Sequence, residues 1–302
     1  MSDTPLISVL MPVRNLGRYV GPSIESVLAQ TWRDFEFLIV DDGSTDGTAE
    51  TVRAYANRDS RIRILRGPSD GISRALNLGL SESRGRYIAR MDGDDLCLPT
   101  RLEQQVRFLE EHRDHVLVGC RCTLIDPDGR PICEKADIKP SHEQIEALLL
   151  RMKWPIVHPS IMVRADAIAK VGGYNESFRI VQDHDLFLRL GETGKLANLQ
   201  EILFLYRQHF NSATLSTDES RMRLLVEIVT EACRRRGIAV PKEVAVTPLE
   251  YVSEVRHRRI WVWLALAAGN RATARHHAIA VLLRTPFSRE SWMAALCAMR
   301  GH

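Results

Sequence analysis

The first hundred residues alternate between two hydrophobic periodicities. Short apolar runs rich in β-branched and aromatic residues predict strands at residues 7–11, 35–40, 61–65 and 87–91. Between these runs, apolar positions at helical spacing predict helices over residues 24–30, 48–57 and 73–81. Strands that alternate with helices in this way predict an α/β fold, in which a mostly parallel sheet is covered by helices on both faces.

The rest of the chain has a mixed pattern and then a purely helical one. Further helices are predicted at residues 100–113, 142–152 and 183–190, and further strands near residues 116–124 and 160–163. Beyond residue 219 every segment has a helical pattern, broken by prolines. We therefore predict an α/β domain at residues 1–218 and a C-terminal helical region at residues 219–302.

Composition and charge narrow the class of protein. The chain of 302 residues is 45% hydrophobic and 26% charged, which is typical of a soluble globular protein and excludes wholesale disorder. The 41 Lys and Arg residues nearly balance the 38 Asp and Glu residues, so we predict no nucleic-acid partner. Residues 221–302 nevertheless carry 14 basic and 6 acidic side chains, which indicates either a separate anionic partner for this region or a solvated basic face.

Cysteine spacing and the N-terminus indicate a reducing compartment. The six cysteines include no C-x-x-C pair, so we expect free thiols and no zinc ribbon. The N-terminus has neither the basic segment nor the cleavage site of a signal peptide, and no apolar run approaches the ~20 residues of a spanning helix. These features predict a cytoplasmic location.

Acidic residues follow two of the predicted strands. Asp41 and Asp42 come after the second strand, and D-G-D-D, which contains Asp92 and Asp94, comes after the fourth. Ligands of open α/β sheets bind outside the carboxyl ends of the strands, so these carboxylates are expected to face one crevice.

The D-G-D spacing favours a metal-bound diphosphate. Residues two apart in extended backbone point to the same side, so Asp92 and Asp94 can converge on one ligand, and Gly93 lets the backbone approach it. Mg²⁺ and Mn²⁺ prefer such oxygen ligands. A single Asp is more often a turn or cap residue, but the repeated pattern argues against that interpretation here. The glycine-rich fingerprints of dinucleotide-binding and P-loop proteins are absent.

In these residues the chain resembles the family 2 glycosyltransferases, which are inverting enzymes of GT-A fold that use nucleotide-diphosphate sugars. The matching motifs follow the order of the family and cover about residues 6–215. They are ISVLMPVRN, VLAQTWRDFEFLIVDDGSTDGT, GISRALNLGL, GRYIARMDGDD, HPSIMVR, VQDHDLFLRL and YRQH.

The resemblance implies a pocket for the donor nucleotide. Asp42 would hydrogen-bond the base, with Asp41 beside it. Pro12 and Val13 would line the same pocket through their backbone, and Arg74 lies near the position of a base contact in some members.

The resemblance also implies a metal and diphosphate site. Asp92 and Asp94 match the DxD motif of the family, with Asp92 and Gly93 near the ribose or metal and Asp94 as a direct ligand of Mg²⁺ or Mn²⁺. His209 would approach the metal or the diphosphate, and Arg207 would contact a phosphate.

Asp183 matches the general base of the family, with Gln182 in place of the usual Glu. By position alone, a helix N-cap is the favoured interpretation of Asp183, and only the resemblance reverses it. We expect the nearby Asp185 to be structural. His158 is expected to pack beneath the acceptor site. Trp154 is expected either to stack on a sugar or to pack in the core.

The function implied is that of a metal-dependent inverting glycosyltransferase. Such an enzyme moves a sugar from a UDP- or dTDP-sugar to a hydroxyl of a glycan or lipid-linked acceptor. A sugar-nucleotide pyrophosphorylase shares the architecture but needs a glycine-rich basic loop after the first strand, which this chain lacks. The other alternative is an inactive GT-A-like module that docks at a membrane or a partner protein.

The helical region combines arginine clusters with tryptophans. Arg234 to Arg236 form one cluster, and Arg256, Arg258 and Arg259 lie close to Trp261 and Trp263. This combination predicts peripheral attachment to an anionic membrane surface, on the inner face of the cell membrane. The alternatives are a helical subdomain that packs on the core and a homodimer interface.

Overall fold

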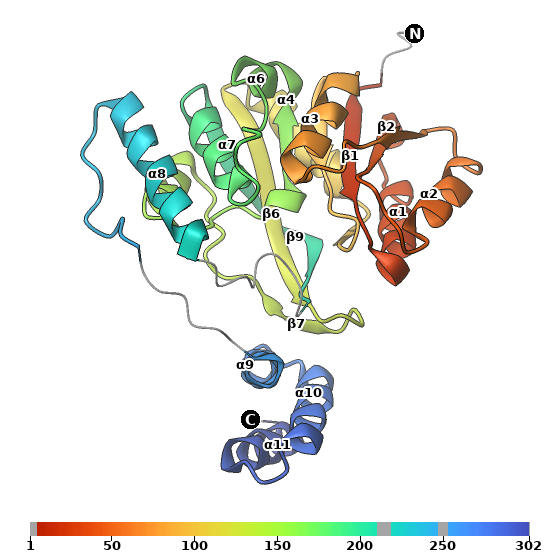
Figure 1. Ribbon diagram of the computed structural model, residues 1–302, viewed down its shortest axis with the longest axis vertical. Coiled ribbons are helices and arrows are strands. Elements are labelled where there is room, and N and C mark those ends of the chain that lie inside the picture. The colour runs from red at the N-terminus through yellow and green to blue at the C-terminus, as the bar shows by residue number, and fades with distance from the viewer. Residues whose placement is uncertain (1–4, 210–218, 247–252, 302) are drawn as a thin grey trace. The chain divides into compact units, whose positions relative to one another are not determined.

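The computed structural model describes residues 5–209, 219–246 and 253–301 (Figure 1). The chain divides into two compact units. The first contains residues 1–121, 137–204 and 220–246, and the second contains residues 122–136, 205–219 and 247–302. The boundary that we predicted after residue 218 adjoins residues outside the described part and stays a prediction.

The described strands form one sheet in the order β3-β2-β1-β4-β8-β6-β9-β5, with β7 paired to β6. Strands β1 to β4 run parallel, whereas β8 is antiparallel to both β4 and β6. The predicted parallel sheet is therefore confirmed for its N-terminal half. The strands are β1 (Ile7–Val13), β2 (Phe35–Asp41), β3 (Ile62–Arg66), β4 (Tyr87–Arg90), β5 (Leu96–Cys97), β6 (His115–Ile125), β7 (Pro131–Glu134), β8 (Met162–Arg164) and β9 (Lys195–Arg207).

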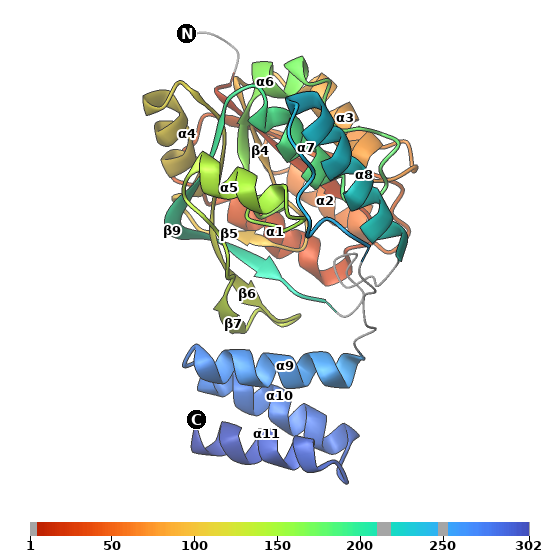
Figure 2. The ribbon, with the colours of Figure 1, turned by 90° about the vertical axis from the view of Figure 1, so that its left-hand side faces the viewer.

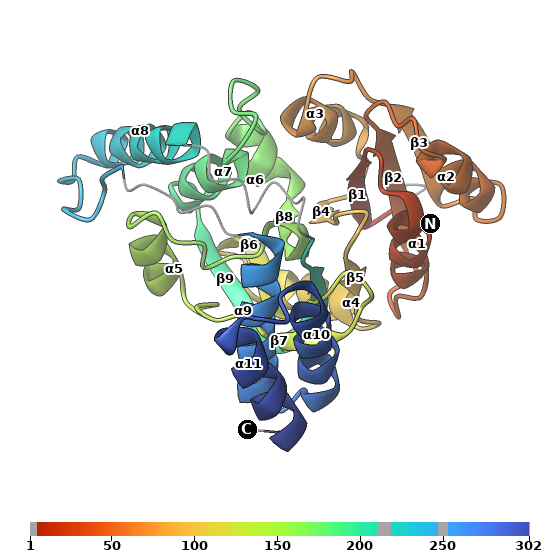
Figure 3. The ribbon, with the colours of Figure 1, turned by 60° about the horizontal axis from the view of Figure 1, so that its bottom comes forward.

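Helices cover the parallel strands, with α3 on one side of β1 and α1 on the other (Figures 1 and 3). Helix α3 packs very close to the sheet, because a Cβ atom on Gly79 would lie 2.1 Å from Leu10 Cδ1. The helices of the first unit are α1 (Val20–Leu28), α2 (Thr48–Ala56), α3 (Ile72–Glu82), α4 (Arg101–Glu111), α5 (His142–Leu149), α6 (Ala165–Lys170), α7 (Gln182–Gly191) and α8 (Glu219–Arg236).

The register brings the carboxyl ends of three strands to one edge of the sheet. Val13, the last residue of β1, pairs with Asp41, the last residue of β2. On the other side of β1, Leu10 pairs with Arg90, so the chain that leaves β4 at Met91 runs beside the last residues of β1. The two predicted acidic segments therefore emerge from the same edge.

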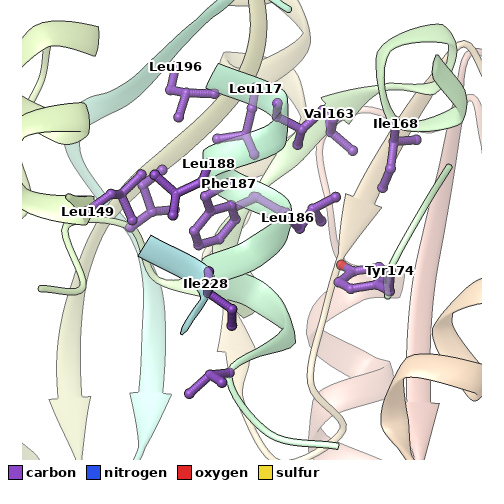
Figure 4. Close-up of a cluster of buried hydrophobic side chains, with 14 of the residues drawn as sticks. Leu117, Leu149, Val163, Ile168, Tyr174, Leu186, Phe187, Leu188, Leu196 and Ile228 are labelled. Atoms are coloured by element: carbon purple, nitrogen blue, oxygen red, sulfur yellow. The ribbon is translucent and has the colours of Figure 1, made fainter. Parts of the chain in front are cut away.

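Helix α7 is held by apolar side chains on nearly every side. Leu186, Phe187, Leu188 and Leu190 are all fully buried. Figure 4 shows this helix surrounded by side chains from β6, β8, α5 and α8. This packing fixes the position of the first turn of α7, which carries Asp183.

The second unit contains helices α9 (Glu254–Ala267), α10 (Arg271–Arg284) and α11 (Arg289–Arg300). Helix α10 packs against both α9 and α11 (Figure 2). The core between the helices consists of small side chains, namely Val262, Ala265, Ala274, Ala278, Ala294, Ala295 and Ala298. Among the described residues, no helix has the length and apolar character that a membrane crossing requires.

Candidate functional site

The edge of the sheet at β1 and β2 holds the predicted base-binding residues. Pro12 and Val13 end β1 and are buried. The backbone N–H of Asp42 donates to the carbonyl of Val13 at 2.9 Å, so the DDGS segment continues the pairing of the two strands. The structure therefore brings these three predicted residues together.

The Asp42 carboxylate organises the loop that follows β3. It is 4% exposed, and its oxygens accept the backbone N–H groups of Ser69 at 2.7 Å and Gly71 at 3.3 Å. A Cβ atom on Gly67 would lie 2.8 Å from Asp42 Oδ1, so glycine is needed for the loop to approach. A carboxylate offers about four lone-pair sites, so Asp42 keeps acceptor capacity for a base. The neighbouring Asp41 accepts the N–H of Ser44 at 2.9 Å and closes a turn.

Arg74 lies in a different network. Its guanidinium pairs with Asp70 one turn earlier and with Glu176 at 3.2 Å, and its side chain is 49% exposed. These two carboxylates account for its position on α3. A base contact by Arg74 stays a prediction.

Three carboxylates converge after β4. Asp92, Asp94 and Asp95 each offer an oxygen, and these oxygens lie within 4.8 Å of one another. Asp92 and Asp94 were predicted as metal ligands, and Asp95 is an additional member that is 1% exposed. The D-G-D-D run already contained this residue, but strand alternation alone gave no reason to include it. Three convergent oxygens suit a hard divalent cation such as Mg²⁺ or Mn²⁺.

Gly93 is explained by packing. A Cβ atom at this position would lie 2.3 Å from Leu16 Cδ1 and 2.9 Å from Val13 Cγ1. The missing side chain therefore lets the DxD segment lie against the end of β1. This contact ties the carboxylate cluster to the base-binding edge, and a contact between Gly93 and a ligand stays a prediction.

A layer of buried polar groups surrounds the cluster. Arg90 is 3% exposed, and its Nη2 lies 2.6 Å from Asp92 Oδ1. Its Nε and Nη1 atoms have no hydrogen-bond partner among the described residues. Nearby, His158 Nε2 and the Tyr174 hydroxyl are 2.7 Å apart, and both rings are buried. No pattern in the sequence marks Arg90 or Tyr174 as part of the site.

Burial and neighbouring charges shift the pKa values of Asp92 and His158. Burial raises the pKa of Asp92 above its usual range, and the neighbouring charges of Asp94 and Asp183 act in the same direction, against the guanidinium of Arg90. Burial lowers the pKa of His158 well below its usual range, and Arg90 adds to that effect. His158 is therefore neutral at physiological pH, and Arg90 is the cation that faces the carboxylates.

Asp183 lies in the first turn of α7. The N-cap position belongs to Val181, and no side chain caps this helix end, so the N-cap interpretation of Asp183 is wrong. Its Oδ1 accepts the backbone N–H of His184 at 2.9 Å. Val181 has φ of 57°, a left-handed conformation that is costly for a β-branched residue and typical of functional sites. Asp185, by contrast, forms an ion pair with Arg189 at 2.5 Å, as its expected structural role requires.

Trp154 packs within the first unit. Its ring lies edge-on to His184 at 5.7 Å between centroids, and the guanidinium of Arg221 lies 4.8 Å from its ring centroid. These contacts favour the packing interpretation over a sugar platform.

Arg207 and His209 lie in the second unit, at and just beyond the end of β9. The Arg207 guanidinium donates to the carbonyls of Asp126 and Pro127, both at 3.2 Å. The phosphate and metal contacts of these two residues stay predictions.

A second cluster, Asp126, His276 and His277, also has the composition of a metal site. However, the Arg258 guanidinium lies 3.2 Å from His277 Nδ1, and because guanidinium only donates, Nδ1 accepts and Nε2 carries the proton. That Nε2 lies 3.1 Å from Asp126 Oδ2, so the two side chains approach each other directly. This cluster links β6 to α9 and α10 within the second unit.

A mostly parallel α/β sheet whose carboxyl edge carries this carboxylate cluster defines the class of nucleotide-sugar-dependent transferases. Comparison with solved structures identifies the fold. The chain superposes on residues 1–349 of Staphylococcus aureus TarS in complex with UDP-GlcNAc with a TM-score of 0.60, at 15% identity over 98% of this chain and 92% of that one. The mannosyltransferase PcManGT from Pyrobaculum calidifontis, in complex with GDP-Man and Mn²⁺, also gives 0.60, at 16% identity over 99% of this chain and 86% of that one. At these identities the comparison shows a shared GT-A-like fold.

Sequence comparison shows the family. The model of "Glycosyl transferase family 2" matches residues 8–172. EpsE of Bacillus subtilis (strain 168) is 38% identical over 245 residues, which cover 78% of this chain and 84% of EpsE. The O-antigen biosynthesis glycosyltransferase WbnJ of Escherichia coli is 36% identical over 215 residues, which cover 70% of this chain and 83% of WbnJ. The chain belongs to glycosyl transferase family 2 and is a glycosyltransferase.

Proposed function

We propose that the protein is a metal-dependent inverting glycosyltransferase that moves a sugar from a UDP- or dTDP-sugar to a hydroxyl of a glycan or lipid-linked acceptor. The observation that carries this proposal is the convergence of Asp92, Asp94 and Asp95 at the edge of the sheet, within electrostatic range of Asp183. The names of the relatives and neighbours, which include O-antigen biosynthesis and complexes with UDP and UDP-GlcNAc, support a role in polysaccharide or glycolipid assembly.

The donor would lie along the edge of the sheet. Asp42, with Asp41 beside it, would accept hydrogen bonds from the base, while Pro12 and Val13 line the pocket. The position of Asp42 is preset, because two backbone N–H groups already hold its carboxylate. A preorganised acceptor costs little entropy on binding.

The carboxylate cluster would hold Mg²⁺ or Mn²⁺ through Asp92 and Asp94, with Asp95 as an additional ligand. A divalent cation at this place supplies Lewis acidity for the leaving diphosphate. Arg90 orients Asp92 through the 2.6 Å contact.

Asp183 is proposed as the general base. In an inverting transfer the acceptor hydroxyl attacks the anomeric carbon on the face opposite the diphosphate, so a base has to take the hydroxyl proton on that face. Asp183 Oδ1 accepts the N–H of His184, and the carboxylate keeps further acceptor sites for the hydroxyl. Gln182 carries no charge, so the carboxylate of Asp183 acts without the acidic neighbour that is usual in the family.

The test compares Asp183→Asn with Asp185→Asn in donor binding and in transfer. Binding is measured as the thermal shift with UDP, dTDP and GDP, each with Mn²⁺ or EDTA. We expect a metal-dependent shift with UDP or dTDP that Asp183→Asn retains, and transfer or donor hydrolysis that falls by roughly 10²- to 10⁴-fold in this variant. Asp185→Asn is expected to lower stability with little effect on kcat.

Two outcomes contradict the proposal. Full activity of Asp183→Asn excludes this residue as the base. Absence of any nucleotide shift together with absence of hydrolysis favours the inactive docking module.

A further inference from the structure

The first arginine cluster, Arg234 to Arg236, forms ion pairs and hydrogen bonds within the protein. Arg234 pairs with Glu231 and Arg235 with Glu192, both at 2.8 Å. Arg236 donates to the carbonyl of Leu188 at 2.7 Å. Arg235 and Arg236 join α8 to α7 and its C-cap within the first unit, so they are poor candidates for contact with an external partner, whereas the pair of Arg234 lies within α8 itself.

The second cluster, on α9, also forms contacts within the protein through Trp261, Arg258 and Arg259. Trp261 is 4% exposed and lies edge-on to His277 at 5.0 Å. Arg258 contacts Glu254 at 2.8 Å and also His277, and Arg259 pairs with Glu290. The expected contact of Trp261 with a membrane is therefore wrong, because this ring belongs to the interior of the second unit.

Large apolar side chains of the second unit lie instead on its surface. Ile260, Trp263 and Leu264 are exposed on α9, and a larger number of such residues is exposed at α10 and α11. The core between the helices is built of alanines, which leaves the larger residues outside. We define the α10–α11 face as Leu283, Phe287, Trp292, Met293, Leu296 and Met299, whose exposed fractions are 78%, 100%, 50%, 51%, 46% and 61%. So many large exposed apolar side chains within 17 residues are uncommon on a monomer, and exposed apolar surface of this kind marks an interaction site.

The face is continuous along the chain. Trp292, Met293, Leu296 and Met299 recur at helical spacing and form one stripe of α11. The Trp292 Nε1–H donates to the carbonyl of Pro286 at 2.7 Å, which ties this stripe to the loop that presents Phe287.

The charge around the face identifies the kind of partner. Residues 271–301 contain five arginines and a single acidic residue, Glu290, which is already paired with Arg259. Arg289 and Arg300 begin and end α11, so they bracket the apolar stripe, and both are exposed. A second copy of the chain would place arginines opposite arginines, whereas an anionic surface would neutralise them.

We propose that the α10–α11 face docks the protein on an anionic lipid bilayer. Helices of 12 and 14 residues with an apolar stripe and flanking arginines are suited to lie in the plane of the interface, with the aromatic and thioether side chains among the acyl chains. The arginines would contact lipid phosphates at the rim. This proposal involves no step of the sugar transfer, so it can be tested independently of the proposed function.

The test is vesicle flotation of the full chain. Vesicles of phosphatidylcholine alone are compared with vesicles that contain about 30 mol % phosphatidylglycerol. We expect binding to the anionic vesicles alone, and weaker binding at high salt because the charges are then screened. Leu283→Ser/Phe287→Ser is expected to weaken binding at least about tenfold, and Arg289→Gln and Arg300→Gln roughly fivefold each.

The control variant replaces an exposed apolar residue outside the α10–α11 face. Ile64→Ser removes an apolar residue that is 40% exposed on β3 of the first unit, and should leave vesicle binding unchanged. Leu283 and Phe287 bury little area, so their replacement should preserve the fold and the hydrolysis of donor. Failure of the unaltered protein to bind anionic vesicles at low salt overturns the proposal, as does equal binding by the Leu283→Ser/Phe287→Ser variant. A dimer that this variant abolishes, without vesicle binding, would assign the face to a second copy.

Discussion

Replacement of Asp94 by Asn should stabilise the ligand-free protein while it removes metal-dependent donor binding. The three carboxylate oxygens of the cluster lie within 4.8 Å of one another. At this distance two unit charges repel by about 1 kcal/mol in water and by about 3 kcal/mol at an effective dielectric constant of 20. Asp94 is partly exposed, so the lower value applies. We expect the free energy of unfolding to rise by about 1 kcal/mol and Tm by about 2 °C.

The pH dependence of this effect has a defined sign. Because burial and the neighbouring carboxylates raise the pKa of Asp92 in the fold, the native protein binds more protons than the unfolded chain between the usual pKa and the raised one. The free energy of unfolding therefore falls as pH rises through this window. Asp94→Asn removes one of the causes, so the fall should be smaller in the variant.

Thermal unfolding in EDTA, and in Mn²⁺ with UDP, measures both effects. A ligand at a hundredfold excess over Kd stabilises by about 2.7 kcal/mol, and Asp94→Asn should lose most of that shift. Asp59→Asn is a matched control, since Asp59 accepts three hydrogen bonds from Arg61 and its removal should lower Tm. An Asp94→Asn protein that unfolds below the unaltered one in EDTA would refute the repulsion argument. Retention of the full Mn²⁺-dependent shift would place the metal elsewhere.

Two further predictions concern buried carboxylates and the groups that stabilise them. Arg90→Met leaves Asp92 beside two carboxylates without its cation, so the free energy of unfolding, measured in urea, should fall by about 3 kcal/mol. Arg90→Lys keeps a cation at this position and should lose less stability. Equal stability of both variants and the unaltered protein would contradict the pairing of Arg90 with Asp92. Although burial opposes ionisation, His277 and the backbone N–H of Arg130 lower the pKa of Asp126 to about 2. The stability that this carboxylate contributes, about 2 kcal/mol, should therefore persist above pH 4 and disappear as pH falls from about 4 to about 2. Acid titration followed by far-UV circular dichroism measures this loss, which Asp126→Asn should abolish.

The elements that were predicted correctly are those whose signal is local. The four parallel strands, helices α1 to α4 and helix α7 show clear periodicity, and their alternation already implied that Asp42 and Asp92 share one edge. Strand β9 was missed, because Asn198 and Gln200 interrupt its apolar pattern, and its position depends on pairing with distant strands. Strand β5 has two residues, too few for a periodic signal.

The polar surroundings of the site could not be predicted for a related reason. Arg90 ends an apolar strand, and Tyr174 lies 84 positions further along, in a loop between α6 and α7. What makes them part of the site is burial beside Asp92, and burial of a charged side chain depends on tertiary packing that one sequence does not display. The spacing of Asp70 and Arg74, by contrast, is a local i,i+4 signal that the sequence analysis did not use, and it argues against a free guanidinium at Arg74.

The second unit shows why an aromatic and basic pattern can mislead. In most amphipathic helices the large apolar residues mark the buried face, so the W-V-W segment and its arginines were interpreted as a surface feature only on account of their charge. Here alanines on three helices form the core, because small side chains let the helices approach closely. One tryptophan of the segment, Trp261, fills the space beside His277, while Trp263 is 41% exposed. The large residues of α10 and α11 then have no interior to occupy. A core of small residues therefore turns the hydrophobic stripe outward, and the surface that could meet a membrane follows from the packing of the alanines and not from the position of the arginines.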